Sequence, residues 1–293
     1  MYKVLILGGR GMLGHMVQRV LSEQETLLVE STSSKKIPNY IWFNIEEGIE
    51  SLNQSIEKYG PFNYIINCIG VLNINIHKKD PKIIENAILV NALFPHKLAE
   101  IVRDRSIRVI QISTDGVFAN NADTCLEDNP RNCDDVYGWT KALGEVISPN
   151  FLNIRCSIIG PSPYLHNGIL DWFLSQPKGS IVNGYTEQMW TGITTLQFAN
   201  LCKLLIIDNY FDMVRKEAPT HHFCPNQTLS KYELLQLFKE IFKTDLSVKP
   251  NANEEHIISR VLETKYTTIK EIFGHNFPMK QVIRELAIEM EDQ

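Results

Sequence analysis

The sequence predicts an α/β protein: a doubly wound parallel sheet followed by a smaller, mostly helical C-terminal region. The first two thirds of the chain alternate short β-rich apolar runs with longer helical patterns, which is typical of a parallel sheet wrapped by helices. After residue 160 this rhythm changes, because helical patterns dominate and prolines punctuate short connections. The 293 residues, 44% of them hydrophobic, are enough to bury a main core with a smaller companion.

The individual elements follow from the same patterns. Apolar runs predict strands at 2–7, 26–32, 39–43, 64–70, 107–113 and 151–157. Helical patterns predict helices near 12–24, 46–58, 81–105 and 135–147, the third kinked or split by Pro95, and a later helix with one apolar face at 230–242. We expect residues 1–160 to form the sheet domain and residues 161–293 to pack on the carboxyl edge of the sheet, where such folds bind ligands. A return of the chain to the sheet near 190–225 stays open.

The composition argues against several classes of protein. The formal net charge of −5 gives no basic field for a phosphate backbone, so we expect no nucleic-acid partner. No apolar run approaches the roughly 20 residues of a membrane span, and the first run breaks after four residues, too early for a signal peptide. The six cysteines form no C-x-x-C pair and lie mostly in apolar stretches, as reduced thiols do. We expect a cytoplasmic protein with no membrane partner, no disulfide and no metal, and a homodimer stays open.

A glycine-rich turn follows the first predicted strand. In "VLILGGRGMLG" (4–14), Gly8, Gly11 and Gly14 stand between that strand and the first predicted helix. Glycines there permit a tight turn and let backbone N–H groups, including those of Met12 and Leu13, approach a pyrophosphate at the positive end of the helix. A purely structural turn is the alternative, but the position of the glycines favours a dinucleotide site on a Rossmann-type sheet.

The end of the second predicted strand indicates which dinucleotide binds. An NAD site usually carries an acidic residue about 20 positions after the glycines. Here "VESTSSKK" (29–36) offers Ser31, Ser33 and Lys35, and its only acid, Glu30, falls early. Together with Arg10 in the glycine turn, this cluster can accommodate a 2′-phosphate, so the sequence favours NADPH over NADH. The alternative is that the two lysines belong to a solvated loop.

The stretch "DDVYGWTKALGEV" (134–146) carries a tyrosine and a lysine four residues apart. On a helix, Tyr137 and Lys141 would share one face, so that the ammonium favours the ionised phenol. A phenol with a pKa near its usual value of about 10 is otherwise a poor acid–base group at neutral pH. Helix surface is the ordinary explanation for this spacing. However, the strand at 107–113 leads into Thr114, whose hydroxyl can hold a substrate oxygen that Tyr137 protonates.

Several pieces of the chain match one family in order. They are "GGRGMLG" (8–14), "NCIG" (67–70), "VNALFPHKLAE" (90–100), "STDGVF" (113–118), "YGWTKALGE" (137–145) and "IRCSIIG" (154–160). With these pieces the chain resembles the extended short-chain dehydrogenase/reductases, and within them the dTDP-4-dehydrorhamnose reductase-like group of nucleotide-sugar reductases. The segment "GYTEQMWTGITT" (184–195) is similar to the later substrate-side segment of that group.

The resemblance implies roles for individual residues. Thr114, Tyr137 and Lys141 would be the catalytic trio, and Lys141 would also contact the nicotinamide ribose. Together with the glycine turn and the cluster at the end of the second strand, the predicted cofactor-binding set comprises Gly8, Arg10, Gly11, Met12, Leu13, Gly14, Ser31, Ser33, Lys35, Asn44, Ile45, Cys68, Ile69, Gly70, Asn91, Tyr137 and Lys141. Within this set, Asn44 and Ile45 resemble the adenine-side pair. Asn91 is either a helix-packing amide or a residue that shapes the site.

The implied substrate side is less regular. It comprises Thr114, Asp115, Gly116, Asn167 and Trp190. Gly116 stands where the rhamnose-pathway enzymes usually carry an aromatic residue, and this change is expected to enlarge or loosen the wall near the sugar. Trp190 is either a pocket residue or a core anchor.

The activity that the resemblance implies is the NADPH-dependent reduction of the 4-keto group of a nucleotide-linked 4-keto-6-deoxy sugar, in the synthesis of cell-surface polysaccharide precursors. The related dehydratases carry an Asp-Glu pair after the threonine, whereas this chain has Asp115 and Gly116. The missing carboxylate favours reduction, since hydride transfer needs only one proton donor. A nucleotide-sugar epimerase with bound NAD, and a non-catalytic regulatory subunit of the same fold, stay open as alternatives.

Overall fold

The computed structural model describes residues 1–76, 80–120, 124–252 and 259–291. Its centre is a parallel sheet that contains seven strands within the described residues, in the order β12-β7-β5-β4-β1-β2-β3. These strands are β1 (Tyr2–Leu7), β2 (Leu27–Ser33), β3 (Ile41–Trp42), β4 (Tyr64–Asn67), β5 (Arg108–Thr114), β7 (Phe151–Cys156) and β12 (Thr220–His222). The strand order reverses at β1, which lies between β2 and β4. The predicted doubly wound parallel sheet is confirmed.

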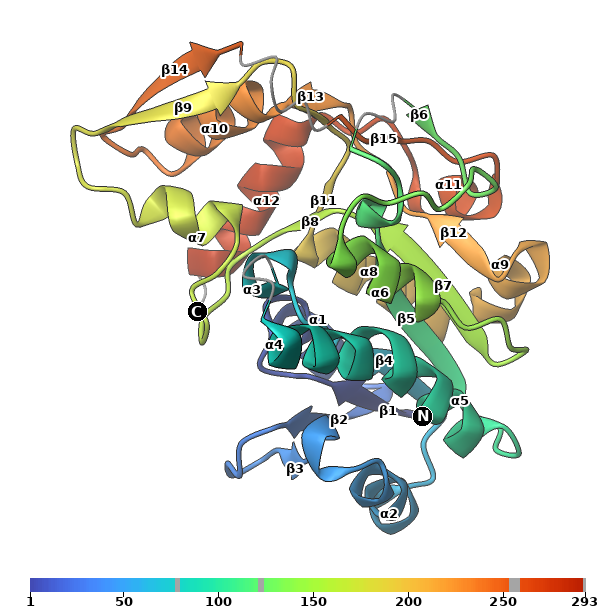
Figure 1. Cartoon of the computed structure of the whole chain (residues 1–293). Coiled ribbons are helices and arrows are strands. Elements are labelled where there is room, and N and C mark those ends of the chain that lie inside the picture. The colour runs from blue at the N-terminus through green and yellow to red at the C-terminus, as the bar shows by residue number, and fades with distance from the viewer. Residues whose placement is uncertain (77–79, 121–123, 253–258, 292–293) are drawn as a thin grey trace.

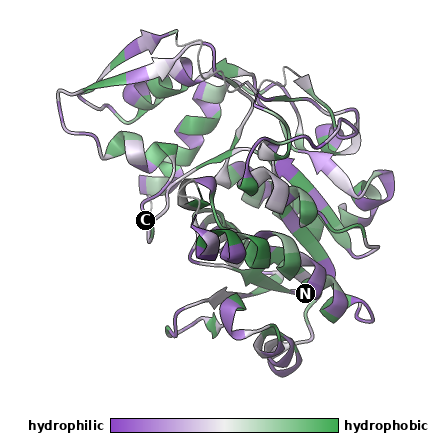
Figure 2. Cartoon of the chain, in the orientation of Figure 1, coloured by the Kyte–Doolittle hydropathy of each residue, from purple (hydrophilic) through white to green (hydrophobic). Residues whose placement is uncertain are grey.

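The core lies on both faces of this sheet. Successive residues of a strand point to opposite faces, so Val4 and Ile6 of β1 join one hydrophobic cluster while Leu5 and Leu7 join the other. Helices α1 (Met12–Ser22) and α8 (Thr195–Ile207) contribute to the first cluster, and α2 (Glu50–Tyr59) and α5 (Phe94–Val102) to the second. Figure 2 shows hydrophobic residues along the central strands, whereas the outlying α2 is largely hydrophilic. Burial on two faces explains why the central strands are near-continuous apolar runs.

The third predicted helix is divided into three parts. It consists of α4 (Pro81–Ala87), a π-helical segment η2 (Ile88–Leu93) and α5. Pro95 lies at the start of α5. A proline has no N–H to donate, and its ring clashes with the carbonyl four residues earlier, that of Asn91, so a regular helix cannot continue through this point. The interruption therefore falls where the sequence predicts it.

Some predicted boundaries differ from the structure. The helix predicted to reach residue 147 is α6 (Val136–Leu143), which ends at Gly144. A Cβ atom at Gly144 would lie 1.9 Å from the carbonyl oxygen of Asn91, so the close approach of η2 requires glycine at this point. The run at 39–43 forms only the two-residue β3, and the region before α2 is a 3₁₀ turn, η1 (Ile45–Glu47).

Beyond residue 160 the chain builds a lobe and also returns to the sheet. The lobe, at the upper left of Figure 1, contains α7 (Ile169–Leu174), β9 (Ile181–Tyr185), α10 (Lys231–Ile241), β14 (Ser247–Asn251) and α12 (Met279–Glu291). Helices α8 and α9 (Phe211–Glu217) then lead to β12, which pairs in parallel with β7. The division into two domains at residue 160 stays a prediction.

Short elements complete the fold. They are α3 (Asn73–Ile76), η3 (Asp115–Val117), β6 (Thr124–Cys125), β8 (Ile158–Ile159), β10 (Met189–Trp190), β11 (Ile193–Thr194), β13 (Leu229–Ser230), β15 (Val261–Leu262) and α11 (Thr268–Phe273). Strand β8 pairs with β11, and β10 pairs with β13. Among the described helices, none is both long and apolar enough to cross a membrane.

Candidate active site

The glycine turn joins β1 to α1 in a very tight arrangement. Gly8 has a φ of +82°, which favours glycine, and its N–H donates to Thr32 Oγ1 at 3.0 Å. A Cβ atom at Gly14 would lie 2.2 Å from the carbonyl oxygen of Gly8, so only glycine fits between the turn and the helix. Helix α1 has no side-chain cap at Gly11 and no acid in its first turn. Its first N–H groups, including those of Met12 and Leu13, are therefore suited to bind an anion.

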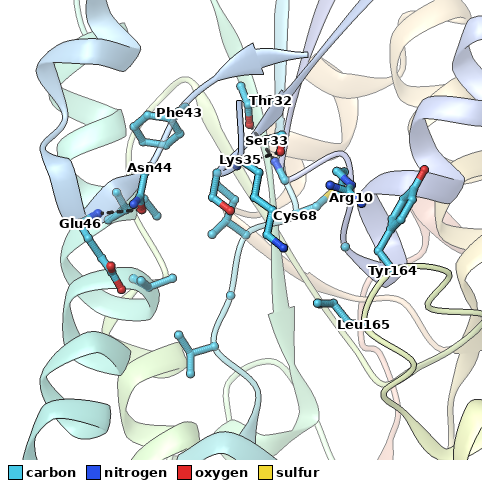
Figure 3. A pocket seen from close by; sticks show the side chains of 18 of the residues that line it. Arg10, Thr32, Ser33, Lys35, Phe43, Asn44, Glu46, Cys68, Tyr164 and Leu165 are labelled. Atoms are coloured by element: carbon cyan, nitrogen blue, oxygen red, sulfur yellow. Dashed lines mark hydrogen bonds between the residues drawn. The ribbon is translucent and has the colours of Figure 1, made fainter. Parts of the chain in front are cut away.

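A cavity of about 330 Å³ opens in front of this turn, between the carboxyl ends of β1, β2 and β4 (Figure 3). Pockets for small molecules and cofactors have volumes from roughly 300 Å³ upward. The cavity is lined by these residues of the predicted cofactor set: Gly8, Arg10, Gly11, Ser33, Lys35, Asn44, Ile45, Cys68, Ile69 and Gly70. Segments far apart in sequence thus meet around one space, at the reversal of strand order where doubly wound sheets bind nucleotides.

Other members of the predicted set do not line the cavity. Ser31 is buried behind the glycine turn, where a Cβ atom at Gly9 would lie 2.7 Å from its own Cβ. Asn91 is also buried: its Oδ1 accepts from the Val71 N–H at 2.8 Å, and its Nδ2 donates to Val71 O at 3.0 Å and to Thr140 Oγ1 at 3.2 Å. Asn91 therefore packs α6 against the segment after β4 and fixes the cavity wall at Val71.

Several lining residues escape the sequence analysis. They are Phe43, Glu46, Val71, Asn86, Val90, Tyr164 and Leu165. Thr32 and Ser34 also line the cavity, and both belong to the hydroxyl-rich stretch 29–36 that the sequence analysis identifies. Tyr164 and Leu165 come from beyond residue 160, and no local pattern links them to the glycine turn.

The predicted catalytic trio lies at the end of β5 and on α6. Thr114 ends β5, and its Oγ1 accepts from the Gly116 N–H and donates to Asp115 Oδ1, each at 3.0 Å. Helix α6 begins at Asp135, whose Oδ1 accepts from the Gly138 N–H at 2.7 Å, and this cap places Tyr137 in the first turn. Lys141 follows one turn later, is buried, and donates from Nζ to Ile112 O at 2.8 Å.

Gly116 lies where two members of the trio, Thr114 and Tyr137, come together. A Cβ atom at this position would lie 3.2 Å from Cε1 of Tyr137 and 3.4 Å from Oγ1 of Thr114. A side chain at Gly116 would begin in tight contact with the Tyr137 ring, and the enlarged or loosened wall near the sugar stays a prediction. Glycine permits the close contact between the phenol ring and the threonine.

Burial governs the protonation of the two ionisable members of the trio. It raises the pKa of Tyr137 to about 12, although a hydrogen bond with Thr114 acts in the opposite direction. Burial also lowers the pKa of Lys141 to about 8, with the charge of Glu145 opposing it. In the structure without cofactor, burial dominates the pKa of the phenol and the Lys141 ammonium donates to Ile112 O, so the lowering of the phenol pKa by Lys141 and a bound nicotinamide stays a prediction. Tyr137 keeps its proton at neutral pH, as a proton donor must.

Lys141 also connects the trio to the cavity. Its charge lowers the pKa of the Cys68 thiol, against the larger effect of burial, which raises that pKa to about 12. Cys68 lines the cavity, whereas Lys141 and Tyr137 are not among its lining residues, so the ammonium lies behind the cavity wall. Lys141 thus links the cavity wall at Cys68 with the helix that carries Tyr137 one turn earlier.

A buried ion pair fixes α6 against the sheet. Arg155 of β7 donates to Glu145 from Nε at 2.7 Å and from Nη2 at 2.8 Å, and both side chains are almost completely buried. Ser113 Oγ of β5 donates to the same carboxylate at 2.6 Å. The pair therefore locks the end of α6 to β5 and β7, and so fixes Tyr137 and Lys141 relative to Thr114. The sequence analysis does not identify either partner.

On the predicted substrate side, Trp190 lies next to Lys231, a residue that the sequence analysis does not consider. Trp190 is only 4% exposed and its Nε1 donates to Ser157 Oγ at 2.7 Å, which favours the core-anchor alternative. Lys231, at the start of α10, lies with Nζ 4.8 Å from the centroid of the Trp190 ring. Burial lowers the pKa of Lys231 to about 8, and the charge of Asp115 opposes this effect. Lys231 therefore places a cation on the Asp115 side of the trio. Asn167, also predicted on the substrate side, is not among the residues that line the cavity.

Comparison with known proteins places this arrangement in a family. The family model described as "RmlD substrate binding domain" matches residues 2–159, more than half of the 293-residue chain. The chain belongs to the RmlD substrate binding domain family. The segment that matches the RmlD family contains the glycine turn, the end of β5 and the tyrosine and lysine of α6.

One curated relative of this RmlD-family chain matches only part of it. The "probable low-salt glycan biosynthesis reductase Agl14" of Haloferax volcanii is 29% identical over 162 residues, 53% of this chain and 52% of that protein. The match thus spans about half the length of this curated relative.

Solved structures match over nearly the whole chain. A dTDP-4-dehydrorhamnose reductase from Clostridium acetobutylicum is 21% identical, with a TM-score of 0.79 and 99% of each chain covered. One from Bacillus anthracis in complex with NADP is 17% identical, with a TM-score of 0.76 and the same coverage. At these identities the likeness shows the fold.

Proposed function

We propose that the protein is an NADPH-dependent reductase of the 4-keto group of a nucleotide-linked 4-keto-6-deoxy sugar, acting in the synthesis of cell-surface polysaccharide precursors. The observation that carries this proposal is the meeting of Thr114 and Tyr137 at Gly116, beside a buried Lys141 that borders a dinucleotide-type cavity. Membership of the RmlD family and likeness to dTDP-4-dehydrorhamnose reductases support it.

The residues present fit a nicotinamide dinucleotide. The uncapped N-terminus of α1 suits its pyrophosphate, and the Gly8–Gly14 contact leaves room for it at the backbone. Arg10 and Lys35 line the same cavity and provide positive charge for a further phosphate (Figure 3). When bound, a reduced nicotinamide would supply the hydride for C4 of the sugar.

The trio has separate tasks in this mechanism. Tyr137 carries a proton at neutral pH and gives it to the oxygen that develops at C4. Thr114 Oγ1 already accepts from the Gly116 N–H, so its single hydrogen can turn from Asp115 to that oxygen. Lys141 holds positive charge beside the cofactor cavity, where it stabilises the phenolate that remains after proton transfer.

The decisive experiment is to incubate the protein with NADPH and dTDP-, UDP- or GDP-linked 4-keto-6-deoxy sugars and to follow the absorbance of the reduced cofactor. We expect oxidation of NADPH with one of the sugars, and a new hydroxyl at C4 in the product. Conversion of a nucleotide sugar that carries a hydroxyl at C4, such as UDP-glucose, without added cofactor and by protein that retains NAD, would indicate the epimerase instead. Absence of turnover with every sugar, in protein that binds nucleotide, would favour the regulatory subunit.

We predict tighter binding of NADPH than of NADH, because Arg10 and Lys35 line the cavity and no acid stands in the usual place. Replacing both by alanine should weaken NADPH by about tenfold or more, as expected for lost hydrogen bonds to a charged group, and should leave NADH nearly unchanged. Titration of both cofactors by calorimetry measures this. Lys36→Ala is the matched control, since Lys36 Nζ lies over the Trp42 ring at 4.6 Å and does not line the cavity. Equal losses for both cofactors would contradict a role of these side chains in reading the phosphate.

We also predict that Lys231 contributes to binding of the nucleotide sugar. Lys231→Met keeps the aliphatic stem over Trp190 and removes the charge beside Asp115, so it should raise the KM for the sugar by roughly tenfold and spare cofactor affinity. The exposed Lys249 of β14, changed to methionine, is the control. A normal KM for the sugar in Lys231→Met would remove this residue from the proposed site. Trp190→Ala is the poorer variant, because it would open a cavity in the core.

A further inference from the structure

The segment after residue 160 reaches the mouth of the cofactor cavity. Tyr164 and Leu165 line the cavity together with Gly8, Arg10 and Gly11, although more than 150 residues separate the two groups in sequence (Figure 3). Tyr164 is 46% exposed and so is not a core residue. Its position at the mouth raises the question of what its ring does there.

The ring of Tyr164 lies against the guanidinium of Arg10. The Cζ atom of Arg10 is 4.0 Å from the ring centroid, and Figure 3 shows the two side chains next to each other at one side of the cavity. Within the described part of the chain, no carboxylate forms an ion pair with Arg10. An arginine whose guanidinium face contacts an aromatic ring can still donate from its N–H groups, which point outward in the guanidinium plane. The Arg10 guanidinium is therefore oriented by the ring while its charge is not neutralised.

Tyr164 is itself held from two other directions. Its side chain lies near that of Tyr40, which stands between β2 and β3: burial, together with the neighbouring Tyr164 phenol, raises the pKa of Tyr40. The imidazole of His15 packs edge-on at 6.4 Å between ring centroids. These contacts fix the ring relative to both the glycine turn and the segment that carries Lys35.

The backbone that presents Tyr164 is a tight turn anchored on α1 and α7. The N–H groups of Leu165 and His166 donate to Ser162 O at 3.3 and 2.8 Å, and the Ser162 N–H donates to Asp171 Oδ2 at 2.9 Å. At Gly168, where φ is +111°, an added Cβ would lie 2.6 Å from Cε of Met12 in α1. The turn is thus packed onto the helix whose N-terminus faces the cavity.

We propose that Tyr164 is a positioning residue for the cofactor, which holds the Arg10 guanidinium so that it binds the 2′-phosphate of NADPH. Lys35 and Ser33 line the same cavity and complete the group that faces this phosphate. The inference rests on the proposed use of NADPH and adds that discrimination between NADPH and NADH depends on a residue outside the segment that matches the RmlD family.

The test compares binding of NADPH, NADH and two fragments, adenosine 2′,5′-bisphosphate and ADP, to the wild type and variants by calorimetry. Tyr164→Leu should weaken NADPH and the 2′,5′-bisphosphate by roughly 2- to 30-fold, the range of a cation–π contact, and leave NADH and ADP unchanged. Tyr164→Phe keeps the ring and loses the hydroxyl, so its loss should be smaller. In Arg10→Ala, the further change Tyr164→Leu should have no additional effect, because the two residues act as one unit.

Trp172→Leu is the matched control, since Trp172 is another exposed aromatic residue of the same region, at 45% exposure, and does not line the cavity. Equal weakening of ADP by Tyr164→Leu would overturn the proposal, because Arg10 would then bind the pyrophosphate. Additive losses in the double variant, or unchanged NADPH binding in a folded Tyr164→Leu protein, would overturn it too. If the wild type itself prefers NADH, the proposed use of NADPH fails together with this inference, whereas the other outcomes leave that function intact.

Discussion

Replacing Tyr137 by phenylalanine is expected to leave the fold and cofactor binding nearly intact and to lower turnover by roughly 10²- to 10⁴-fold, as for a lost general acid. The phenylalanine ring retains the contact at Gly116, so the packing of α6 on η3 is preserved and only the proton donor is removed. Steady-state rates with the preferred 4-keto sugar between pH 6 and 9 measure the effect. Near wild-type rates across this range would make Tyr137 an ordinary helix residue and would remove the basis of the reductase proposal.

Two further variants separate the roles of the trio. Lys141→Met should slow turnover and also weaken cofactor binding, because the ammonium acts on Cys68 of the cavity wall and shares α6 with Tyr137. Thr114→Val removes one hydrogen bond to the developing oxyanion, so it should reduce turnover less than Tyr137→Phe and leave binding unchanged. A Thr114→Val variant that loses cofactor binding would contradict this division of roles.

The same variants allow a test by pH. Burial lowers the pKa of Lys141 to about 8 in the cofactor-free protein, so the ammonium loses its proton as the pH rises through this value. We therefore expect kcat/KM for NADPH, which reports on the free enzyme, to fall above about pH 8. The fall should be absent in Lys141→Met and retained in Lys231→Met, because Lys231 lies on the sugar side.

The second large effect concerns stability. Arg155→Met should lower the free energy of unfolding by about 3–5 kcal/mol, because it leaves the Glu145 carboxylate buried without its main partner. Adding Glu145→Leu should restore most of this loss, since replacing both members of a buried ion pair by apolar groups is often neutral. Urea unfolding at neutral pH measures both variants.

Lys97→Ala is the control for this comparison, since Lys97 and Glu100 form an exposed pair that should contribute less than about 1 kcal/mol. Burial tends to raise the pKa of Glu145, but the hydrogen bond and charge of Arg155 outweigh it, so the pKa is lowered. A lowered carboxyl pKa stabilises the fold above the usual glutamate range, and this contribution disappears as the pH falls below that range. The difference in the free energy of unfolding between wild type and Arg155→Met should therefore become smaller only at acid pH. A constant difference down to the acid transition would contradict it.

The parts of the fold predicted from sequence are those with local signals. Strands β1, β4, β5 and β7 are largely buried on both faces and so are rich in apolar residues. The turn after β1 requires glycine because its backbone comes so close to the start of α1. The tyrosine and lysine of α6 are recognisable because a helix puts residues four apart on one face. In contrast, β12 has the polar sequence Thr-His-His and is a strand only because β7 offers an open edge.

The unpredicted parts of the site depend on contacts between distant segments. Glu145 and Arg155 meet because the chain just after α6 comes close to β7, and neither residue carries a pattern that indicates a pair. Tyr164 reaches Arg10 through a turn whose course is set by packing on α1. The raised pKa of Tyr137 could not be predicted from the sequence for the same reason, because burial depends on the assembled fold.

The return of the chain to the sheet through α8 and β12 bears on how the protein is put together. Helix α8 covers the apolar face of α1, and β12 occupies the outer edge of β7, so both belong to the core of the part that matches the RmlD family. A fragment ending near residue 159 would expose the Val17 and Leu21 side of α1 and leave β7 as a bare edge strand. The limit of the family match is therefore not a boundary of independent folding, and the sheet can be completed only after the chain has passed through the lobe's first elements, α7 and β9, and come back.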